Sequence, residues 1–324
     1  MRRRDVIALF GAVAARPFAV HAQQAMRRIG VLVAYAEGDP EMQARLAAFR
    51  QGLEQLGWSE GRNVSIDIRF APAGAGQEQA RAREVVAVNP DVILAHTPQV
   101  VAALQRESRT IPIVFVGVAD PVGAGFAASL NRPGGNLTGF LGIEASIAGK
   151  WLTMLKAVAP VARVALIANP KNIFDYFVQA AQPVANSLGI ELVPGAVTSA
   201  AEIERAIESF ANTPNGGLMF PPDATTSVNR DLVIALAARH RLPAVYSFRL
   251  FVTAGGLMSY GVDFIHQNHD AASYVDRILR GEKPAVLPVQ APTKFEAAVN
   301  LKTAKTLGLT IPPDLLVAAD QVIE

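Results

Sequence analysis

Polar residues that could contact a ligand follow several short apolar runs of this sequence. The run GLMFPPD ends in Asp223, and the similar run GLMSYGVD ends in Asp263. Any one such residue is adequately explained as a helix N-cap. Five junctions of this kind favour a shared polar cleft, because helix N-termini offer free N–H groups and a positive dipole end to a carboxylate or phosphate. The other three junctions carry His96-Thr97, Asp120 and Asn169.

Residue types for an enzyme are present but sparse. His96 could act as an acid–base group with Asp223 or Asp263 on a small carboxylate. No activated nucleophile stands beside it, and the sequence has no glycine-rich phosphate loop and no G-x-S-x-G motif. His266 and His269 are poor evidence for a metal without a third ligand. An exported α/β enzyme is the alternative to a binding protein, and we expect no catalytic residue, metal or organic cofactor.

The elements that must position these residues alternate regularly along the chain. Apolar runs such as 28–36 and 91–97 have the length and Val/Ile content of buried strands, and 40–58 repeats apolar residues as an amphipathic helix does. The βαβ order of 28–118 predicts a parallel, doubly wound sheet. A second alternation over 151–248 predicts another α/β half. A further strand and helix in the tail indicate that the chain crosses between the halves more than once.

The composition bounds the class of protein. The 324 residues are 51% hydrophobic and 18% charged, with a formal net charge of +2 and no cysteine. Such a chain can bury a sizeable core and cannot form disulfides or thiolate metal sites. No basic block is interleaved with aromatic residues, so we expect no nucleic-acid partner.

The N-terminus has the pattern of an export signal. Arg2, Arg3 and Arg4 precede an apolar run over 6–15, and Val20-His21-Ala22 offers a small-residue exit. We expect a cleavable signal peptide over 1–22 and a periplasmic location for the mature protein. The arginines are compatible with both the general and the twin-arginine routes. A buried N-terminal helix is the alternative interpretation.

Four longer segments carry a resemblance to a known family. Together they resemble periplasmic substrate-binding proteins of ABC transporters, in the branch that includes a tryptophan-binding member, and the resemblance covers essentially the whole mature chain. It implies a monomer with a type I periplasmic-binding-protein fold and a small-molecule ligand that is delivered to an ABC permease. A ligand-sensing domain for a membrane receptor is a further alternative. The segments are GLEQLGWSEGRNVSIDIR (52–69), PIVFVGVADPVGAGF (112–126), NRPGGNLTG (131–139) and VNLKTAKTLGLTIPPDLL (299–316).

The resemblance also implies how the chain divides. Two Rossmann-like lobes with parallel sheets would be joined by three hinge crossings, with the ligand between them. On this basis lobe 1 takes 27–139 and 249–283, and lobe 2 takes 140–248 and 284–324.

The same resemblance implies roles for individual residues. In members that bind amino acids, hydroxyls and backbone N–H groups hold the α-carboxylate, which suits Thr97. Acids hold the α-ammonium, which suits Asp223 and Asp263. We therefore expect an apolar or aromatic α-amino acid as ligand. The remaining expected cleft residues are Asn169, His96 beside Thr97, and four aromatic residues that could form apolar walls: Tyr35, Phe140, Phe174 and Tyr246.

Overall fold

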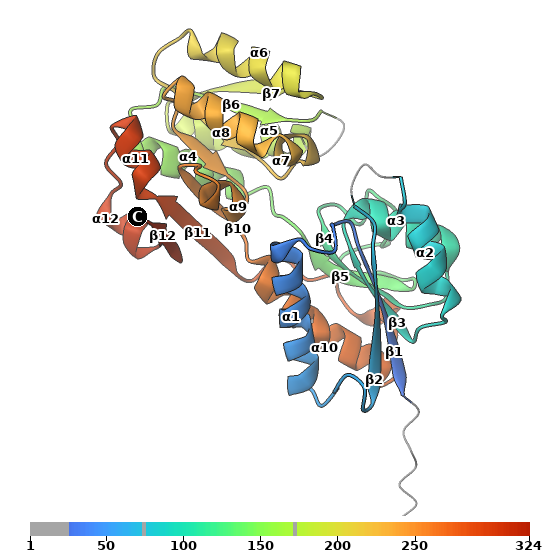
Figure 1. Cartoon of the computed structure of the whole chain (residues 1–324). Helices are drawn as coiled ribbons and strands as arrows, with labels where there is room; N and C mark the ends of the chain where they lie inside the picture. The colour runs from blue at the N-terminus through green and yellow to red at the C-terminus, as the bar shows by residue number, and fades with distance from the viewer. Residues whose placement is uncertain (1–25, 73–75, 171–173) are drawn as a thin grey trace, which may run out of the picture.

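The computed structural model describes residues 26–72, 76–170 and 174–324. These residues form two α/β lobes, each built on its own sheet (Figure 1). The expected signal peptide, residues 1–22, lies outside the described residues. Within the described ranges, no helix is long and apolar enough to cross a membrane.

Lobe 1 is a five-stranded parallel sheet with the order β2-β1-β3-β4-β5. Alternate residues of β3 face opposite cores: Leu94 packs on the side of α1 and α10, and Ile93 packs on the side of α2 and α3. The elements are β1 (Arg27–Val33), α1 (Pro40–Gln55), β2 (Val64–Phe70), α2 (Glu78–Ala87), β3 (Val92–His96), α3 (Pro98–Glu107), β4 (Ile113–Val118), β5 (Leu137–Leu141), α10 (Phe264–Leu279) and the 3₁₀ turn η1 (Pro284–Val286).

Lobe 2 is a seven-stranded sheet with the order β12-β11-β10-β9-β8-β6-β7. Its pairs are parallel except for β10 and β11, which run antiparallel. The elements are α4 (Ile147–Val158), β6 (Arg163–Ala168), α5 (Phe174–Ser187), β7 (Glu191–Ala196), α6 (Ala200–Ala211), β8 (Gly216–Phe220), α7 (Ala224–Val228), α8 (Arg230–Arg239), β9 (Ala244–Tyr246), α9 (Arg249–Thr253), β10 (Met258–Val262), β11 (Phe295–Asn300), α11 (Leu301–Leu307), α12 (Pro313–Val317) and β12 (Gln321–Ile323).

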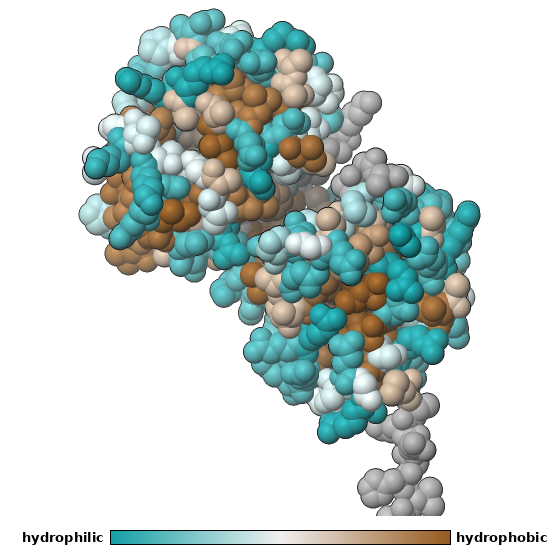
Figure 2. Space-filling view, in the orientation of Figure 1, coloured by the Kyte–Doolittle hydropathy of each residue, from teal (hydrophilic) through white to brown (hydrophobic). Residues whose placement is uncertain are grey.

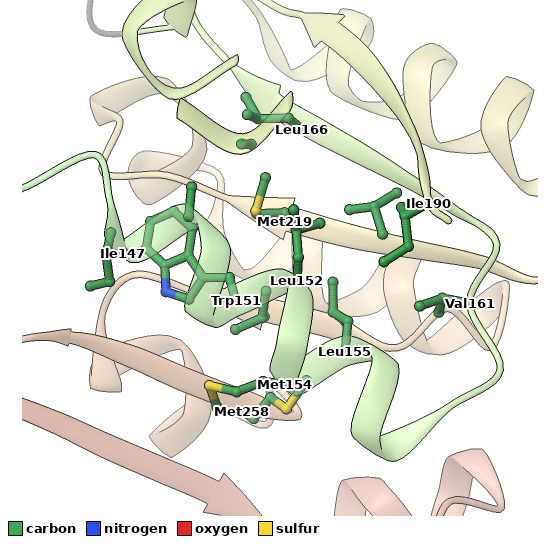
Figure 3. Packing of buried hydrophobic residues seen from close by; sticks show 14 of the residues in the cluster. Ile147, Trp151, Leu152, Met154, Leu155, Val161, Leu166, Ile190, Met219 and Met258 are labelled. Atoms are coloured by element: carbon green, nitrogen blue, oxygen red, sulfur yellow. The ribbon is translucent and has the colours of Figure 1, made fainter. Parts of the chain in front are cut away.

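The core of lobe 2 is organised around α4 (Figure 3). Trp151 is fully buried, stacks on Phe177 at 5.5 Å between ring centroids, and donates its indole N–H to the carbonyl oxygen of Tyr260 at 2.6 Å. Leu152 and Leu155 pack in the same cluster as Met219 of β8. Each lobe thus buries its own apolar core, so the two can move relative to each other as separate bodies.

The chain passes between the lobes three times, which confirms the expected number of crossings. The first passage leads from β5 to α4, the second lies at Asp263 between β10 and α10, and the third lies between Gln290 and β11. The helix α10 returns to lobe 1 and packs against α1 at Gly52 (Figure 1). A Cβ at Gly52 would lie 2.6 Å from the carbonyl oxygen of His269, so the two helix backbones approach closely there.

The strand pairing assigns two segments to a different lobe from the one that the family resemblance implies. Residues 249–262 belong with lobe 2, because β10 pairs with β9 and β11, and Phe251 is part of the lobe 2 core. Residues 284–290 belong with lobe 1, because Leu287 is buried in its core and Gln290 pairs with Phe140. Hydrophobic patterning does not show which sheet a single tail strand joins.

Candidate ligand-binding cleft

The two sheets present the carboxyl ends of their parallel strands to the space between the lobes. In Figure 1, α3 follows β3 on the side of lobe 1 that faces lobe 2, and α7 follows β8 on the facing side of lobe 2. Figure 2 shows an open notch between the two lobes, on the side where α3 and α7 face each other. Ligands of open α/β sheets bind outside the strand carboxyl ends, so this notch is the candidate site.

Thr97 is the most distinctive residue on the lobe 1 side. Its backbone has φ +73° and ψ 148°, a region that residues with a side chain rarely occupy. Its hydroxyl is buried but has no hydrogen-bond partner among the described residues, and it does not cap α3. The strained backbone and the unused hydroxyl stand together at the N-terminus of a ten-residue helix, where a carboxylate would find several donors.

On the lobe 2 side, Asn169 and Asp223 follow neighbouring strands. Asn169 donates its amide N–H to the hydroxyl of Thr225 at 3.0 Å. Asp223 is 5% exposed, and one of its carboxylate oxygens accepts the backbone N–H of Thr226 at 2.9 Å. The helix-capping interpretation of Asp223 is therefore correct for that oxygen, and the residue still lies at the strand end that faces lobe 1.

Asp263 lies apart from these residues. It caps α10 through the backbone N–H of His266 at 2.9 Å and pairs with Lys294 at 3.1 Å. Burial alone would raise the pKa of Asp263, but these two contacts outweigh it and lower the pKa. The carboxylate lines a cavity of about 250 Å³ at the hinge, to which Thr97 and Asp223 do not contribute. Asp223 and Asp263 thus do not line the same cavity in this arrangement of the lobes.

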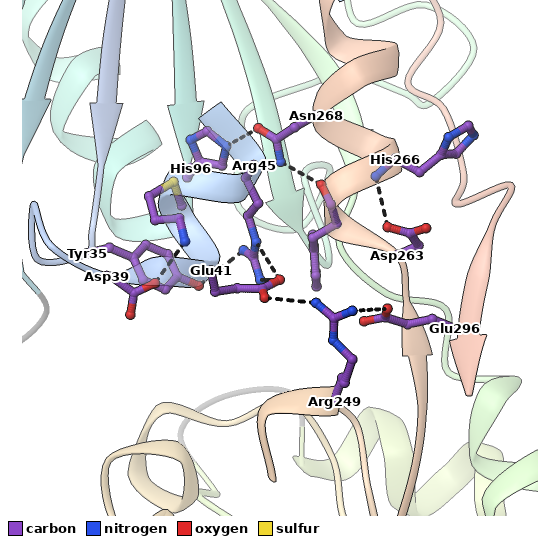
Figure 4. Close-up of polar contacts among 12 residues, drawn as sticks. Tyr35, Asp39, Glu41, Arg45, His96, Arg249, Asp263, His266, Asn268 and Glu296 are labelled. Atoms are coloured by element: carbon purple, nitrogen blue, oxygen red, sulfur yellow. Dashed lines mark hydrogen bonds and ion pairs between the residues drawn. The ribbon is translucent and has the colours of Figure 1, made fainter. Parts of the chain in front are cut away.

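His96 points into lobe 1 and is 2% exposed. Its Nε2 lies 2.6 Å from Oδ1 of Asn268, whose amide nitrogen donates to the carbonyl oxygen of Phe264 at 2.8 Å (Figure 4). Nε2 is therefore the protonated nitrogen. Burial lowers the pKa of His96 to about 4, against the raising effect of the Asn268 hydrogen bond. Because His96 is buried and its pKa is this low, its imidazole is a weak base with little access to a substrate, so it is poorly suited to act as the acid–base group of an enzyme.

The four expected wall aromatics have different environments. Tyr246 is stacked between Phe220 and Phe251 inside lobe 2, and burial raises the pKa of its hydroxyl. Phe174 is also part of the lobe 2 core. Phe140 packs on Tyr274 and lines the hinge cavity. Among the four, Tyr35 follows β1 at the cleft side and stays partly exposed.

Arg45 and its surroundings were missed by the sequence reasoning. Its guanidinium lies 4.5 Å from the ring centroid of Phe264 and 5.5 Å from that of Tyr35, and the residue is 6% exposed. It donates to the hydroxyl of Tyr35 at 3.3 Å and to Oε1 of Glu41 at 3.4 Å. The i,i+4 spacing of Glu41 and Arg45 is the available sequence signal, but that spacing is common on exposed helix faces.

A second arginine connects the lobes. Arg249 begins α9 in lobe 2, and its side chain lies 3.3 Å from Oε2 of Glu41 in lobe 1 and 3.6 Å from Oε2 of Glu296 in lobe 2 (Figure 4). Beside this contact, the ring of Phe248 lies 6.0 Å from that of Phe264 across the second crossing.

In the described ranges, no group of three or more His, Asp or Glu side chains is arranged to hold a metal ion.

Known proteins with similar sequences or structures share this architecture. A tyrosine-binding protein of Clostridioides difficile (strain R20291) is 26% identical over 275 residues, which is 83% of this chain and 78% of that protein. A Streptococcus pneumonia structure of an ABC domain in complex with L-Trp has a TM-score of 0.82 at 24% identity, covering 92% of this chain and 100% of that one. A conserved domain protein from Vibrio cholerae has a TM-score of 0.81 at 27% identity, covering 92% and 99%.

The family itself follows from the sequence match. The resemblance inferred from the four sequence segments is confirmed, as is the two-lobed periplasmic-binding-protein fold. Residues 28–323 match the family model described as ABC transporter substrate binding protein, and this chain belongs to that family.

Proposed function

We propose that this protein captures an apolar or aromatic α-amino acid between its lobes and delivers it to the permease of an ABC importer. The observation that carries the proposal is Thr97, whose strained backbone and buried, unused hydroxyl lie at the start of α3. The tyrosine-binding relative and the neighbour crystallised with L-Trp support an amino acid as the ligand class.

The proposed chemistry divides the ligand between the lobes. Thr97 and the free N–H groups of the first turn of α3 hold the α-carboxylate. Asp223 and Asn169 receive the α-ammonium when the lobes close, since a buried ammonium requires acceptor partners. Tyr35 supplies an apolar contact for the side chain from lobe 1. We assign Asp263, Phe140, Phe174 and Tyr246 to the hinge and the cores rather than to ligand contact.

Closure between the lobes would couple capture to delivery. Each lobe has its own core and is joined to the other by three crossings, so a ligand that contacts both lobes favours the closed arrangement. We propose that a permease recognises that arrangement. We further propose that the protein acts as a monomer in the periplasm after residues 1–22 are removed.

Calorimetric titration of the mature chain with L-tryptophan, L-tyrosine, L-leucine and L-glutamate tests this proposal. We expect the first three to bind more tightly than L-glutamate. Thr97→Val should weaken binding about tenfold or more, because it removes a hydroxyl from a buried charged ligand group. Thr213→Val, at an exposed site beyond α6, is the matched control and should bind as the wild type does. Unchanged affinity in Thr97→Val would refute this site.

A further inference from the structure

Arg249 and Glu41 form an ion pair that joins the lobes at the edge of the cleft. Arg249 follows the carboxyl end of β9 in lobe 2, and Glu41 lies in the first turn of α1, after the carboxyl end of β1 in lobe 1. The guanidinium and the carboxylate are 3.3 Å apart, with side-chain exposures of 31% and 26% (Figure 4). A partly shielded pair of this kind is stronger than a fully solvated one.

Both partners are fixed within their own lobes. Glu41 also contacts Arg45, which is held between the rings of Phe264 and Tyr35. Arg249 also contacts Glu296 of β11. Burial raises the pKa of Glu296 to about 7, although the charge of Arg249 acts to lower it. Of the two carboxylates, that of Glu41 lies nearer to the Arg249 guanidinium, at 3.3 Å against 3.6 Å for Glu296.

The ion pair is present while the notch between α3 and α7 is open (Figures 1 and 2). Closing the notch rotates one lobe against the other about the crossings, which changes the position of α9 relative to α1. A rotation that separates the two groups would lose their interaction. In the arrangement described here, with the notch open, the ion pair joins the lobes and stabilises that arrangement.

We propose that Arg249 and Glu41 act as an interlobe strut that holds the ligand-free protein open and so lowers its apparent affinity for ligand. In this role Arg249 is a positioning residue and does not contact the ligand. The inference rests on the proposed function for its effect on affinity, but its effect on lobe orientation does not require a ligand. A ligand that binds the closed form must overcome every interaction that is specific to the open form.

Spin-label distance measurements without ligand test the strut directly. The chain has no cysteine, so Arg109→Cys in lobe 1 and Glu204→Cys in lobe 2, both exposed, give two defined label sites. In this background Arg249→Met and Glu41→Gln should each add a population at a new, closed-form distance, and 1 M NaCl should partly reproduce that change by screening the ion pair. Arg163→Met is the matched control, because its partner Glu191 lies in the same lobe. Distance distributions identical to the wild type in both strut variants would overturn the proposal.

Titration with L-tryptophan and L-tyrosine tests the effect on affinity. We expect Arg249→Met to bind about two- to fivefold more tightly than the wild type, the range that corresponds to losing one partly exposed ion pair from the open state. Weaker binding would instead mean that Arg249 contacts the ligand, and would also overturn the proposal. A further outcome is that the wild type binds no amino acid while the distance distributions of Arg249→Met and Glu41→Gln still differ from that of the wild type. That result would support the strut and contradict the proposed function.

Discussion

At the residue scale, the strongest indication of a binding site is Thr97, whose backbone is strained and whose buried hydroxyl makes no hydrogen bond to the described residues. Thr97 occupies a backbone region that glycine accepts more easily, yet its buried hydroxyl neither caps α3 nor has a hydrogen-bond partner among the described residues. Sequence reasoning selected Thr97 from its place at a strand end. It could not have found the strain, because the dihedral angle depends on how β3 joins α3 in the folded chain.

This strain leads to a prediction in which stability and binding change in opposite directions. Thr97→Gly should raise the free energy of unfolding by about 1 kcal/mol, because glycine tolerates φ +73° without steric cost. The same change removes the hydroxyl and should weaken amino-acid binding. Urea denaturation and calorimetric titration measure the two effects. The control is Thr213→Gly, which should not be stabilised because the φ of Thr213 is not positive. A loss of stability in Thr97→Gly would contradict the assigned backbone strain.

His96 gives a second residue-scale prediction, for the dependence of stability on pH. The unfolded chain binds a proton at this histidine near pH 6.5, whereas the folded chain does so only near pH 4. The contribution of His96 is therefore intact above pH 6.5 and is lost as the pH falls from 6.5 to 4, by about 3 kcal/mol at most. Urea denaturation at pH 7.5 and pH 5 should show a smaller acid-induced loss in His96→Gln than in the wild type. Equal losses would contradict the assigned burial.

At the scale of elements, the alternation of strands and helices could be predicted from the sequence. The lobe to which each tail element belongs could not. A strand over 256–261 and a helix over 269–281 were expected in the tail; both elements are present, as β10 and as α10, which begins five residues earlier than expected. The lobe that each joins depends on long-range pairing, here of β10 with β9 and β11. For the same reason, Asp263 resembled Asp223 in sequence but lies in the hinge cavity instead.

The first crossing provides an element-scale prediction. A Cβ at Gly142 would lie 2.6 Å from backbone atoms of Gly117, at the end of β4, so Gly142→Ala forces these two segments apart. We expect a loss of about 1–3 kcal/mol in the free energy of unfolding, because backbone cannot give way as a flexible side chain can. Gly135→Ala is the control, since a Cβ there meets nothing within 4 Å. Equal stability of the two variants would show that the crossing is not tightly packed.

At the scale of the whole molecule, two separate cores and three crossings predict a change of shape on ligand binding. A ligand that joins Thr97 to Asp223 must bring the two strand-end surfaces together, because they lie in different lobes. The radius of gyration measured by solution X-ray scattering should therefore fall when L-tryptophan or L-tyrosine saturates the mature chain. The unliganded Thr97→Val variant should match the unliganded wild type. At the same ligand concentration it should show a smaller fall, which would indicate closure on the bound ligand rather than general compaction. A ligand that binds tightly without changing the radius of gyration would mean that it occupies one lobe, or the hinge cavity, and not the cleft between the lobes.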